Sequence, residues 1–329
     1  MVVLQDDQDF ITLADPYRPE LLAHCYRMTG SVHEAEDLVQ ETYLRAWQAY
    51  DRFEGRSSLR TWLYRIATGA CLVSLRRRSR RPLPTSLGGP TDDPAGDLMR
   101  GSDVPWLEPV PDAMVGTAPD ELGEGATLRE SIRLTLIAAL QHLPPGQRVV
   151  LLLRDILKWR AAEVADLLST TSTAVNNILR RARAQLEHMV PNPDGVSQPG
   201  AAEQRDLLRR YARAFEDFDM AALVVLLRED AVWEMPPFFT WVRGAEEIGR
   251  LISVHCPEVG PGDLRMLPTE ANGQPGFGMY LRDRDDNVYR PFGMHVVDAV
   301  GGVVRHVAVF FDSGLFGWFG LPGKLPAVG

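Results

Sequence analysis

Residues 52–81 read RFEGRSSLRTWLYRIATGACLVSLRRRSRR, and this segment directs the interpretation of the whole chain. Nine of its residues are arginine and Glu54 is its one acid, although the 329-residue chain carries a formal net charge of −9. Phe53, Trp62 and Tyr64 lie among the arginines. Cations with interleaved aromatic rings are typical of a surface that binds a polyanion and stacks its bases. A solvated helix end or a targeting tract is the plainer alternative, which the rest of the chain must test.

The charge of the chain is segregated. A second basic island, residues 129–190, holds nine basic residues against five acids, and both islands lie in an acidic background. Two separated basic islands favour two contacts with one long polyanion. The overall composition, with 45% hydrophobic and 24% charged residues, is that of an ordinary globular protein.

Length and composition also disfavour several classes of protein. No run of about 18 apolar residues occurs, so we expect no membrane contact. The first residues, MVVLQDD, lack the basic start and apolar core of a secretory signal, which favours a cytoplasmic location. Cys25, Cys71 and Cys256 are widely spaced and form neither a disulfide framework nor a metal-ligand pattern. We therefore expect no cofactor and no metal.

The periodicity of the first 126 residues predicts a helical module and a linker. Residues 10–81 place apolar side chains at helical spacing, with Ser31 and Ser58 positioned to cap helices. Residues 82–126 are rich in proline, glycine and aspartate and predict a flexible acidic linker. Trp106 is too apolar for a pure spacer, so we expect it to dock on a neighbour.

A second helical module is predicted over residues 127–190. Within it, helices at 160–168 and 172–186 are joined by the short break Ser169-Thr170-Thr171. Two helices connected by so tight a turn form a helix-turn-helix pattern. The second of these helices is then the one that enters a major groove of DNA.

Residues 201–320 predict a different, α+β module. An amphipathic helix at 204–218 precedes an alternating strand at 231–235, and Gly301-Gly302 is a strong two-residue hairpin signal. Further strand-like runs lie at residues 278–282, 294–300 and 303–311. We expect a curved antiparallel sheet packed against helices.

Five motifs in order carry a family resemblance. The runs YRPEL at residues 17–21, AEDLVQETYLRAW at residues 35–47 and FEGRSSLRTWLYRIA at residues 53–67 precede LPPGQR at residues 143–148 and the helix-turn-helix. Together they resemble regions two and four of the extracytoplasmic-function (ECF) type of bacterial RNA polymerase sigma factor, of the sigma-70 superfamily. The resemblance implies two all-α sigma domains, with core RNA polymerase and promoter DNA as partners, and a role in transcription initiation.

The third module resembles the SnoaL-like, ketosteroid-isomerase-like cone. One branch of these sigma factors carries such an extension, and Trp106-Leu107-Glu108-Pro109 resembles the linker motif of that branch. The resemblance implies that the extension regulates transcription through intramolecular contact with the sigma domains. It makes no prediction about a separate anti-sigma protein. The alternative function is a helix-turn-helix regulator fused to a SnoaL-like small-molecule-binding or isomerase-type enzymatic domain.

The acidic helix of the first module is the candidate polymerase contact. Asp37, Gln40, Glu41 and Arg45 lie three or four residues apart and share one helix face. The resemblance implies that this helix grips the clamp helices of the largest polymerase subunit through Asp37, Gln40 and Glu41. A solvated helix face is the alternative.

The basic segment is the candidate −10 interface. Opening a duplex requires a cationic path for phosphates and a platform for unstacked bases. Phe53 and Trp62 are predicted platforms, with Tyr64 as another choice and a core role as the alternative for Trp62. Gly69 and Val73 stand where the family has Asn and Asp, so neither is given a base-reading role. The predicted phosphate contacts are Arg56, Arg60, Arg65, Arg76, Arg77 and Arg78.

The second helix of the helix-turn-helix is the candidate −35 interface. Its predicted buried side consists of Val175, Ile178, Leu179 and Ala182. Asparagine suits adenine and arginine suits guanine in the major groove. The predicted groove-facing residues are Ser172, Thr173, Asn176, Asn177 and Arg180, and the predicted phosphate contacts are Arg181 and Arg183.

The third module offers no readable acid–base pair, and we expect no enzymatic activity. Its polar candidates are more simply caps, turns or satisfied polar groups, although isomerases of this fold use such residues. The aromatic tail at residues 310–319 either completes the core of this module or docks onto the sigma modules. The polar candidates are Asp217, Asp219, Glu234, His295 and Asp312.

Overall fold

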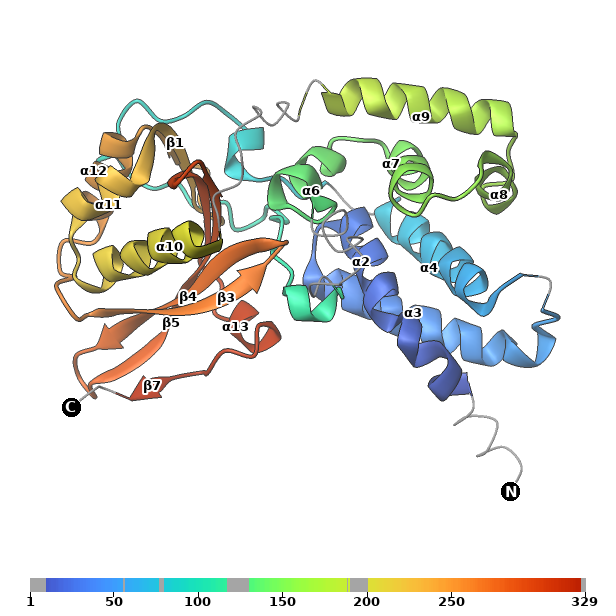
Figure 1. Cartoon of the computed structure of the whole chain (residues 1–329), viewed down its shortest axis with the longest axis horizontal. Coiled ribbons are helices and arrows are strands. Elements are labelled where there is room, and N and C mark those ends of the chain that lie inside the picture. Colours follow the sequence, from blue (N-terminus) through green and yellow to red (C-terminus); the bar gives the residue numbers. More distant parts are fainter. Residues whose placement is uncertain are drawn as a thin grey trace. The chain divides into compact units, whose positions relative to one another are not determined.

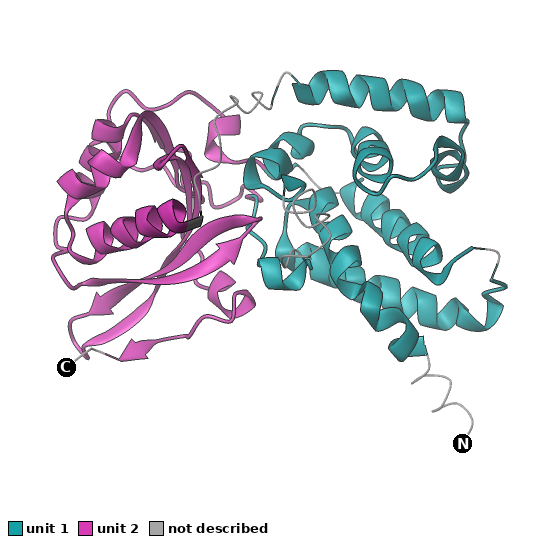
Figure 2. Cartoon of the chain, viewed as in Figure 1, with its two compact units in different colours: residues 1–81, 107–192 teal, residues 82–106, 193–329 magenta. Residues whose placement is uncertain are grey.

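Two compact units make up the chain, and the polypeptide crosses between them three times (Figures 1 and 2). Unit 1 consists of residues 1–81 and 107–192, and unit 2 of residues 82–106 and 193–329. The computed structural model describes residues 10–55, 57–76, 80–116, 130–187, 189 and 201–326. The two units are described separately below.

The first half of unit 1 is built on three helices, α2 (Arg18–Thr29), α3 (Val32–Ala49) and α4 (Leu59–Leu75). Gly30, at φ 72°, ends α2 in the left-handed conformation, and Ser31 then caps α3 by accepting a hydrogen bond from the Glu34 amide at 3.1 Å. Ser58 caps α4 in the same way, so both expected caps are confirmed. Short 3-10 turns are η1 (Asp15–Tyr17), η2 (Tyr50–Arg52) and η4 (Asp112–Met114).

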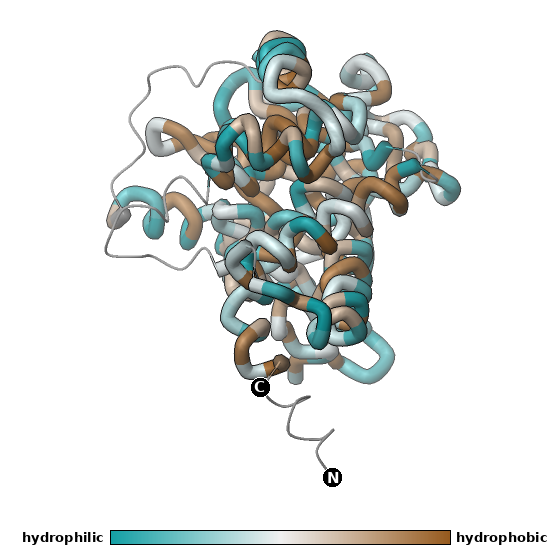
Figure 3. The backbone as a smooth tube through the Cα atoms, turned by 90° about the vertical axis from the view of Figure 1, so that its right-hand side faces the viewer, coloured by the Kyte–Doolittle hydropathy of each residue, from teal (hydrophilic) through white to brown (hydrophobic). Residues whose placement is uncertain are grey.

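The second half of unit 1 contains the helix-turn-helix. Figure 3 shows hydrophilic and hydrophobic residues interspersed along the helical turns of the tube, as burial of one helix face requires. The predicted pattern is confirmed as α8 and α9, joined by a turn in which Ser169 adopts a positive φ of 51°. The elements are α6 (Leu134–Gln141), α7 (Pro145–Leu151), the π-helical turn η5 (Leu152–Ile156), α8 (Ala161–Leu167) and α9 (Ser172–Glu187).

Buried guanidinium groups join the two halves of unit 1: Arg27 of α2 donates to Ser131, and Arg148 makes a larger set of bonds. Arg148, only 2% exposed, donates to the carbonyls of Met28, Gln141 and Leu143 and to the Gln141 side chain. Met28 lies in the last turn of α2, and the other two carbonyls lie at the end of α6. Carbonyls at helix C-termini lack intrahelical partners and carry the negative end of the helix dipole. Arg148 therefore caps two helices at once, which is why its charge tolerates burial.

Unit 2 is an α+β domain, as expected from the sequence. Its sheet follows the order β2-β1-β6-β5-β4-β3, with β7 paired to β5, and β1 and β6 are the parallel neighbours. The hairpin predicted at Gly301-Gly302 is confirmed between β5 and β6. The strands are β1 (Leu227–Glu234), β2 (Trp241–Arg243), β3 (Leu264–Ala271), β4 (Gln274–Asp283), β5 (Val288–Val300), β6 (Val303–Phe310) and β7 (Leu325–Pro326). The helices are η3 (Pro84–Ser86), α10 (Ala201–Glu216), α11 (Met220–Leu226), α12 (Ala245–His255) and α13 (Leu315–Trp318).

Alternate residues of β4 serve the two faces of the sheet. Phe277 joins the core formed with α10, α11 and α12. On the opposite face, Tyr280 contacts the ring of Phe316 at 5.1 Å, and Phe316 is buried. Gly278 lies beneath the same ring, since an added Cβ would lie 3.0 Å from it. The aromatic tail thus contributes to the core of its own domain.

The described part of the predicted linker is packed rather than flexible. Leu83 is 2% exposed, Leu98 packs against the unit 2 core, and the Trp106 ring lies 5.5 Å from that of Phe239. Residues 107–116 instead belong to unit 1. Flexibility was predicted from the acidic, proline- and glycine-rich composition. A few apolar residues spaced along such a segment are nevertheless enough to pack it. The expected docking of Trp106 is confirmed within unit 2.

Candidate nucleic-acid interface

The arginines of α4 already have acidic partners within unit 1. Arg60 forms a bidentate pair with Glu20, with Nε–O distances of 2.8 Å and an Nη2–O distance of 2.6 Å. This hydrogen bond to Glu20 is the main reason why the pKa of Arg60 is raised. Arg65 pairs with Asp166 of α8. Both arginines keep about two fifths of their side-chain surface exposed, at 41% and 39%, so a phosphate can compete for them.

The three aromatic rings of the basic segment have separate environments. Tyr64 is fully buried and contacts Trp159 edge-on at 5.9 Å, so it is a core residue and not a platform for bases. Its burial raises its pKa well above the usual value. Phe53 and Trp62 are partly buried and lie ring to ring at 4.8 Å. This pair is the aromatic surface that α4 and the preceding loop present.

Among the remaining candidates of this segment, the structure describes only some of the arginines. Arg76 is exposed at the end of α4, whereas Arg56, Arg77 and Arg78 lie outside the described residues. Gly69 is exposed, and Val73 is 47% exposed one turn further on.

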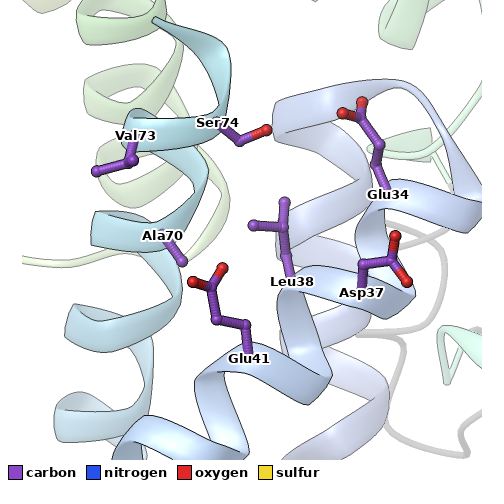
Figure 4. Close-up of a pocket in the computed structure, with 7 residues that line it drawn as sticks. All are labelled: Glu34, Asp37, Leu38, Glu41, Ala70, Val73 and Ser74. Atoms are coloured by element: carbon purple, nitrogen blue, oxygen red, sulfur yellow. The ribbon is translucent and has the colours of Figure 1, made fainter. Parts of the chain in front are cut away.

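A shallow hollow of 260 Å³ lies between α3 and α4 (Figure 4). Asp37, Leu38 and Glu41 line it from α3, facing Ala70 and Val73 of α4. Apolar side chains beside acids suit a partner that carries basic residues. Asp37 therefore lies with Glu41, as the helical spacing predicts.

Gln40, the third predicted polymerase contact, does not line this hollow. It is exposed, and its Nε2 donates to Glu36 at 3.3 Å. Glu41 is itself paired with Arg45 at 2.6 Å. Of the three predicted residues, Asp37 and Gln40 are thus exposed and Glu41 is half-exposed.

The helix α9 has the two faces that the sequence predicts. Thr171 accepts a hydrogen bond from the Ala174 amide at 3.1 Å and so caps the helix. Val175, Leu179 and Ala182 are buried, and Ile178 is half-buried. The seven predicted DNA contacts of α9 are all exposed: Ser172, Thr173, Asn176, Asn177, Arg180, Arg181 and Arg183.

A second hollow, of 450 Å³, lies between α9 and the π-helical turn η5. Arg180 and Arg183 line it, together with Arg154, which the sequence reasoning overlooked because it precedes the helix-turn-helix. Asp155 pairs with Arg183 at 2.5 Å, and this pairing raises the pKa of Arg183. Three arginines thus gather at this hollow, with Glu187 in its lining and Asp155 paired to Arg183, and exposed arginines suit a phosphate backbone.

The polar candidates of unit 2 have structural roles. Asp219 caps α11 through the Ala222 amide, Asp217 pairs with Arg213, and Asp312 accepts a hydrogen bond from the Gly314 amide. These are the caps, pairs and turns that the plainer interpretation expects.

Glu234 and His295 are the two buried candidates. Glu234 accepts from His306 at 2.8 Å and from the Thr85 amide at 3.1 Å. His295 Nδ1 lies 2.9 Å from the Tyr211 hydroxyl, and burial lowers the pKa of His295 to about 3. The two residues therefore have separate partners and do not form an acid–base pair with each other.

None of the described helices is long and apolar enough to cross a membrane. No group of three or more His, Cys, Asp or Glu side chains in the described part of the chain is arranged to hold a metal ion.

Comparison with known proteins identifies the family. Residues 13–81 match Sigma-70 region 2, and residues 133–186 match Sigma-70, region 4. The ECF RNA polymerase sigma factor SigG of Mycobacterium tuberculosis (strain ATCC 25618 / H37Rv) is 53% identical over 321 residues, which cover 96% of this chain and 85% of SigG. The ECF RNA polymerase sigma factor SigJ of the same strain is 28% identical over 252 residues, covering 74% of this chain and 72% of SigJ.

A solved structure agrees with the observed fold. The crystal structure of Mycobacterium tuberculosis extracytoplasmic function sigma factor SigJ matches with a TM-score of 0.61 and 21% identity. The match covers 95% of this chain and 100% of SigJ. With the two regions present and a relative of this similarity along its length, the chain belongs to the ECF family of RNA polymerase sigma factors.

Proposed function

We propose that three separate surfaces of this sigma factor contact core polymerase, the −10 element and the −35 element. The exposed acids of α3, Asp37 and Glu41 with Gln40 beside them, contact core polymerase. The Phe53–Trp62 pair and the arginines of α4 engage the −10 element, and α9 reads the −35 element. The observation that carries the proposal is the exposure of all seven predicted α9 contacts on a helix whose other face is buried.

This division requires unit 1 to open when it binds a promoter. The names of the two elements place them about 25 base pairs apart, roughly 85 Å along B-DNA at 3.4 Å per base pair. Yet Arg65 of α4 is paired directly with Asp166 of α8, and Tyr64 touches Trp159. Two DNA-binding surfaces in contact cannot reach both elements together. The described arrangement of unit 1 is therefore a resting form.

We further propose that the C-terminal domain regulates this opening through the linker. Residues 82–106 lie between the two sigma regions in the chain, and the rest of unit 2 holds their backbone by hydrogen bonds, three of them from side chains. The Thr85 amide binds Glu234, the Gly88 carbonyl accepts from Trp241 at 3.0 Å, and the Pro94 carbonyl bonds to His255 at 3.0 Å. Because its backbone is held in this way, fewer residues of the linker can extend when the two sigma regions separate.

The C-terminal domain is proposed to act without catalysis, and the protein to work in the cytoplasm, where core polymerase and promoter DNA are found. Buried Glu234 supports the first point because both of its carboxylate oxygens are engaged, one by His306 and the other by the Thr85 amide of the linker. A contact between this domain and the sigma regions stays a prediction.

Run-off transcription with purified core polymerase tests the proposal. The full chain is expected to direct initiation at a cognate promoter, and the Asp37→Asn, Glu41→Gln double variant to bind core polymerase at least about tenfold more weakly. Asp51→Asn, an exposed acid outside the hollow, is the matched control. Equal core affinity for the double variant and the control would refute the α3 assignment. A chain that never programmes core polymerase would refute the proposal as a whole.

A further inference from the structure

The carboxylate of Glu108 occupies a built site at the start of α3. Its Oε2 accepts hydrogen bonds from the Ser31 hydroxyl at 2.7 Å and from His33 Nδ1 at 2.9 Å. Its Oε1 lies 3.5 Å from Arg81 Nη1, and the Arg81 side chain is only 13% exposed. Arg81 also pairs with Glu34 at 3.1 Å. A helix N-terminus beside a mostly buried arginine is a strong receptor for a carboxylate.

The residues on either side of Glu108 pack the segment 107–110 against unit 1. Leu107 and Val110 are both fully buried. The Glu108 amide donates to the Gly30 carbonyl at 2.9 Å, and the Glu108 carbonyl accepts from the Tyr26 hydroxyl at 2.8 Å. The segment is therefore held against unit 1 in three ways: by main-chain hydrogen bonds, by two buried apolar side chains and by the ion-paired carboxylate of Glu108. A passive spacer would need none of them.

The ion pair between Arg81 and Glu108 also closes a loop. The chain leaves unit 1 after Arg81, runs through residues 82–106 in unit 2, and returns at Leu107. The pair holds the points of departure and return together, within 3.5 Å at the two side chains. The pair therefore fixes both ends of the segment 82–106 to unit 1.

We propose that Glu108, seated on Ser31, His33 and Arg81, is a latch that keeps the linker on region 2 and so keeps unit 1 closed until polymerase binds. The inference rests on the proposed opening of unit 1. The latch lowers the fraction of molecules that are ready to bind, and apparent affinity falls by that same fraction. Releasing it strengthens core binding without adding a contact to the polymerase.

Amide hydrogen exchange and core-polymerase affinity, measured on the full chain, test the latch. Glu108→Ala removes every side-chain contact of the latch, whereas Glu108→Gln keeps an acceptor for Ser31 and loses the charge that faces Arg81. Asp103→Asn is the matched control, since it neutralises an exposed acid of the same linker. The Glu108→Ala variant is expected to exchange residues 107–116 about tenfold faster and to bind core polymerase up to about tenfold more tightly. The Glu108→Gln variant is expected to lie between it and the wild type.

Two results would overturn the latch. In one, residues 107–116 of Glu108→Ala exchange no faster than in Asp103→Asn. In the other, exchange accelerates but core affinity stays unchanged, which would make Glu108 a purely structural contact. Run-off transcription by the wild type distinguishes these results from failure of the proposed function. If the wild type directs initiation while the variants match the control, the latch alone is wrong.

Discussion

Replacing Arg148 with methionine is expected to destabilise unit 1 by about 3–5 kcal/mol. The guanidinium donates to four acceptors, at 2.8, 3.1 and 3.2 Å and in one shorter contact with the Met28 carbonyl. Methionine keeps most of the apolar stem of the side chain and removes these four bonds. The carbonyls at the ends of α2 and α6 are then left buried without a donor.

The magnitude follows from opposing terms. A hydrogen bond to a charged group contributes about 1.5–3 kcal/mol, so four give about 6–12 kcal/mol. Burying the guanidinium costs several kcal/mol, and the same burial lowers the pKa of Arg148 to about 10. Bonds that share one group are not additive, so the expected loss is about 3–5 kcal/mol, the value typical of removing one member of a buried charged contact, or a factor of roughly 10² to 10⁴ in the opening equilibrium.

Hydrogen exchange followed by mass spectrometry provides the assay, because a chain of two units does not unfold in one step. Protection is expected to fall in α2, α6 and α7 of Arg148→Met and to stay unchanged in β4 and β5 of unit 2. Arg213→Met, which breaks an exposed i,i+4 pair, is the control and should cost no more than about 0.5 kcal/mol. Wild-type protection of α2 and α6 in Arg148→Met would refute the double-capping argument.

Three further predictions concern acid stability, the sheet and the −35 contact. Burial holds the pKa of His24 and of His295 at about 3, so between pH 6.5 and about 3 only the unfolded chain binds their protons. Stability should therefore fall as pH falls through that window, by up to about 1.4 kcal/mol per pH unit and histidine, and thermal melts of His295→Gln should show a shallower decline. Gly276→Ala should destabilise unit 2 by about 1–3 kcal/mol, because the new Cβ would lie 2.6 Å from the His295 carbonyl, whereas Gly69→Ala meets nothing within 4 Å and should be neutral or stabilising in urea titrations. Arg180→Ala should weaken −35 binding by about 1–3 kcal/mol in a DNA titration, and an unchanged affinity would remove Arg180 from the interface.

The sequence anticipated the features that depend on local rules. Helix caps at Ser31 and Ser58, the two faces of α9 and the hairpin at Gly301-Gly302 each follow from side chains within a few residues of one another. Local spacing also brought Asp37 and Glu41 to one helix face. Strands β2 and β3 and helix α12 were not anticipated, because their patterns are short or interrupted by glycine and proline.

Contacts between distant residues could not be anticipated in the same way. The acidic partners of Arg60 and Arg65 lie 40 and 101 positions away in the chain. Local periodicity therefore could not show which arginines form ion pairs within the fold. The same holds for Tyr64, which the sequence offered as a platform and the fold buries beside Trp159.

The amino-acid sequence alone determined the modules, the helix-turn-helix and the basic surfaces, since amphipathic periodicity, capping and turn chemistry act over single turns. Only the tertiary structure decided that the acidic linker is packed, that Glu108 and Glu234 hold it at its two ends, and that Arg148 joins the halves of unit 1. The reason is that a buried charge gains its stability from whichever polar groups the fold brings to it. Those groups come from separate segments, and their distances are set by packing rather than by order in the chain.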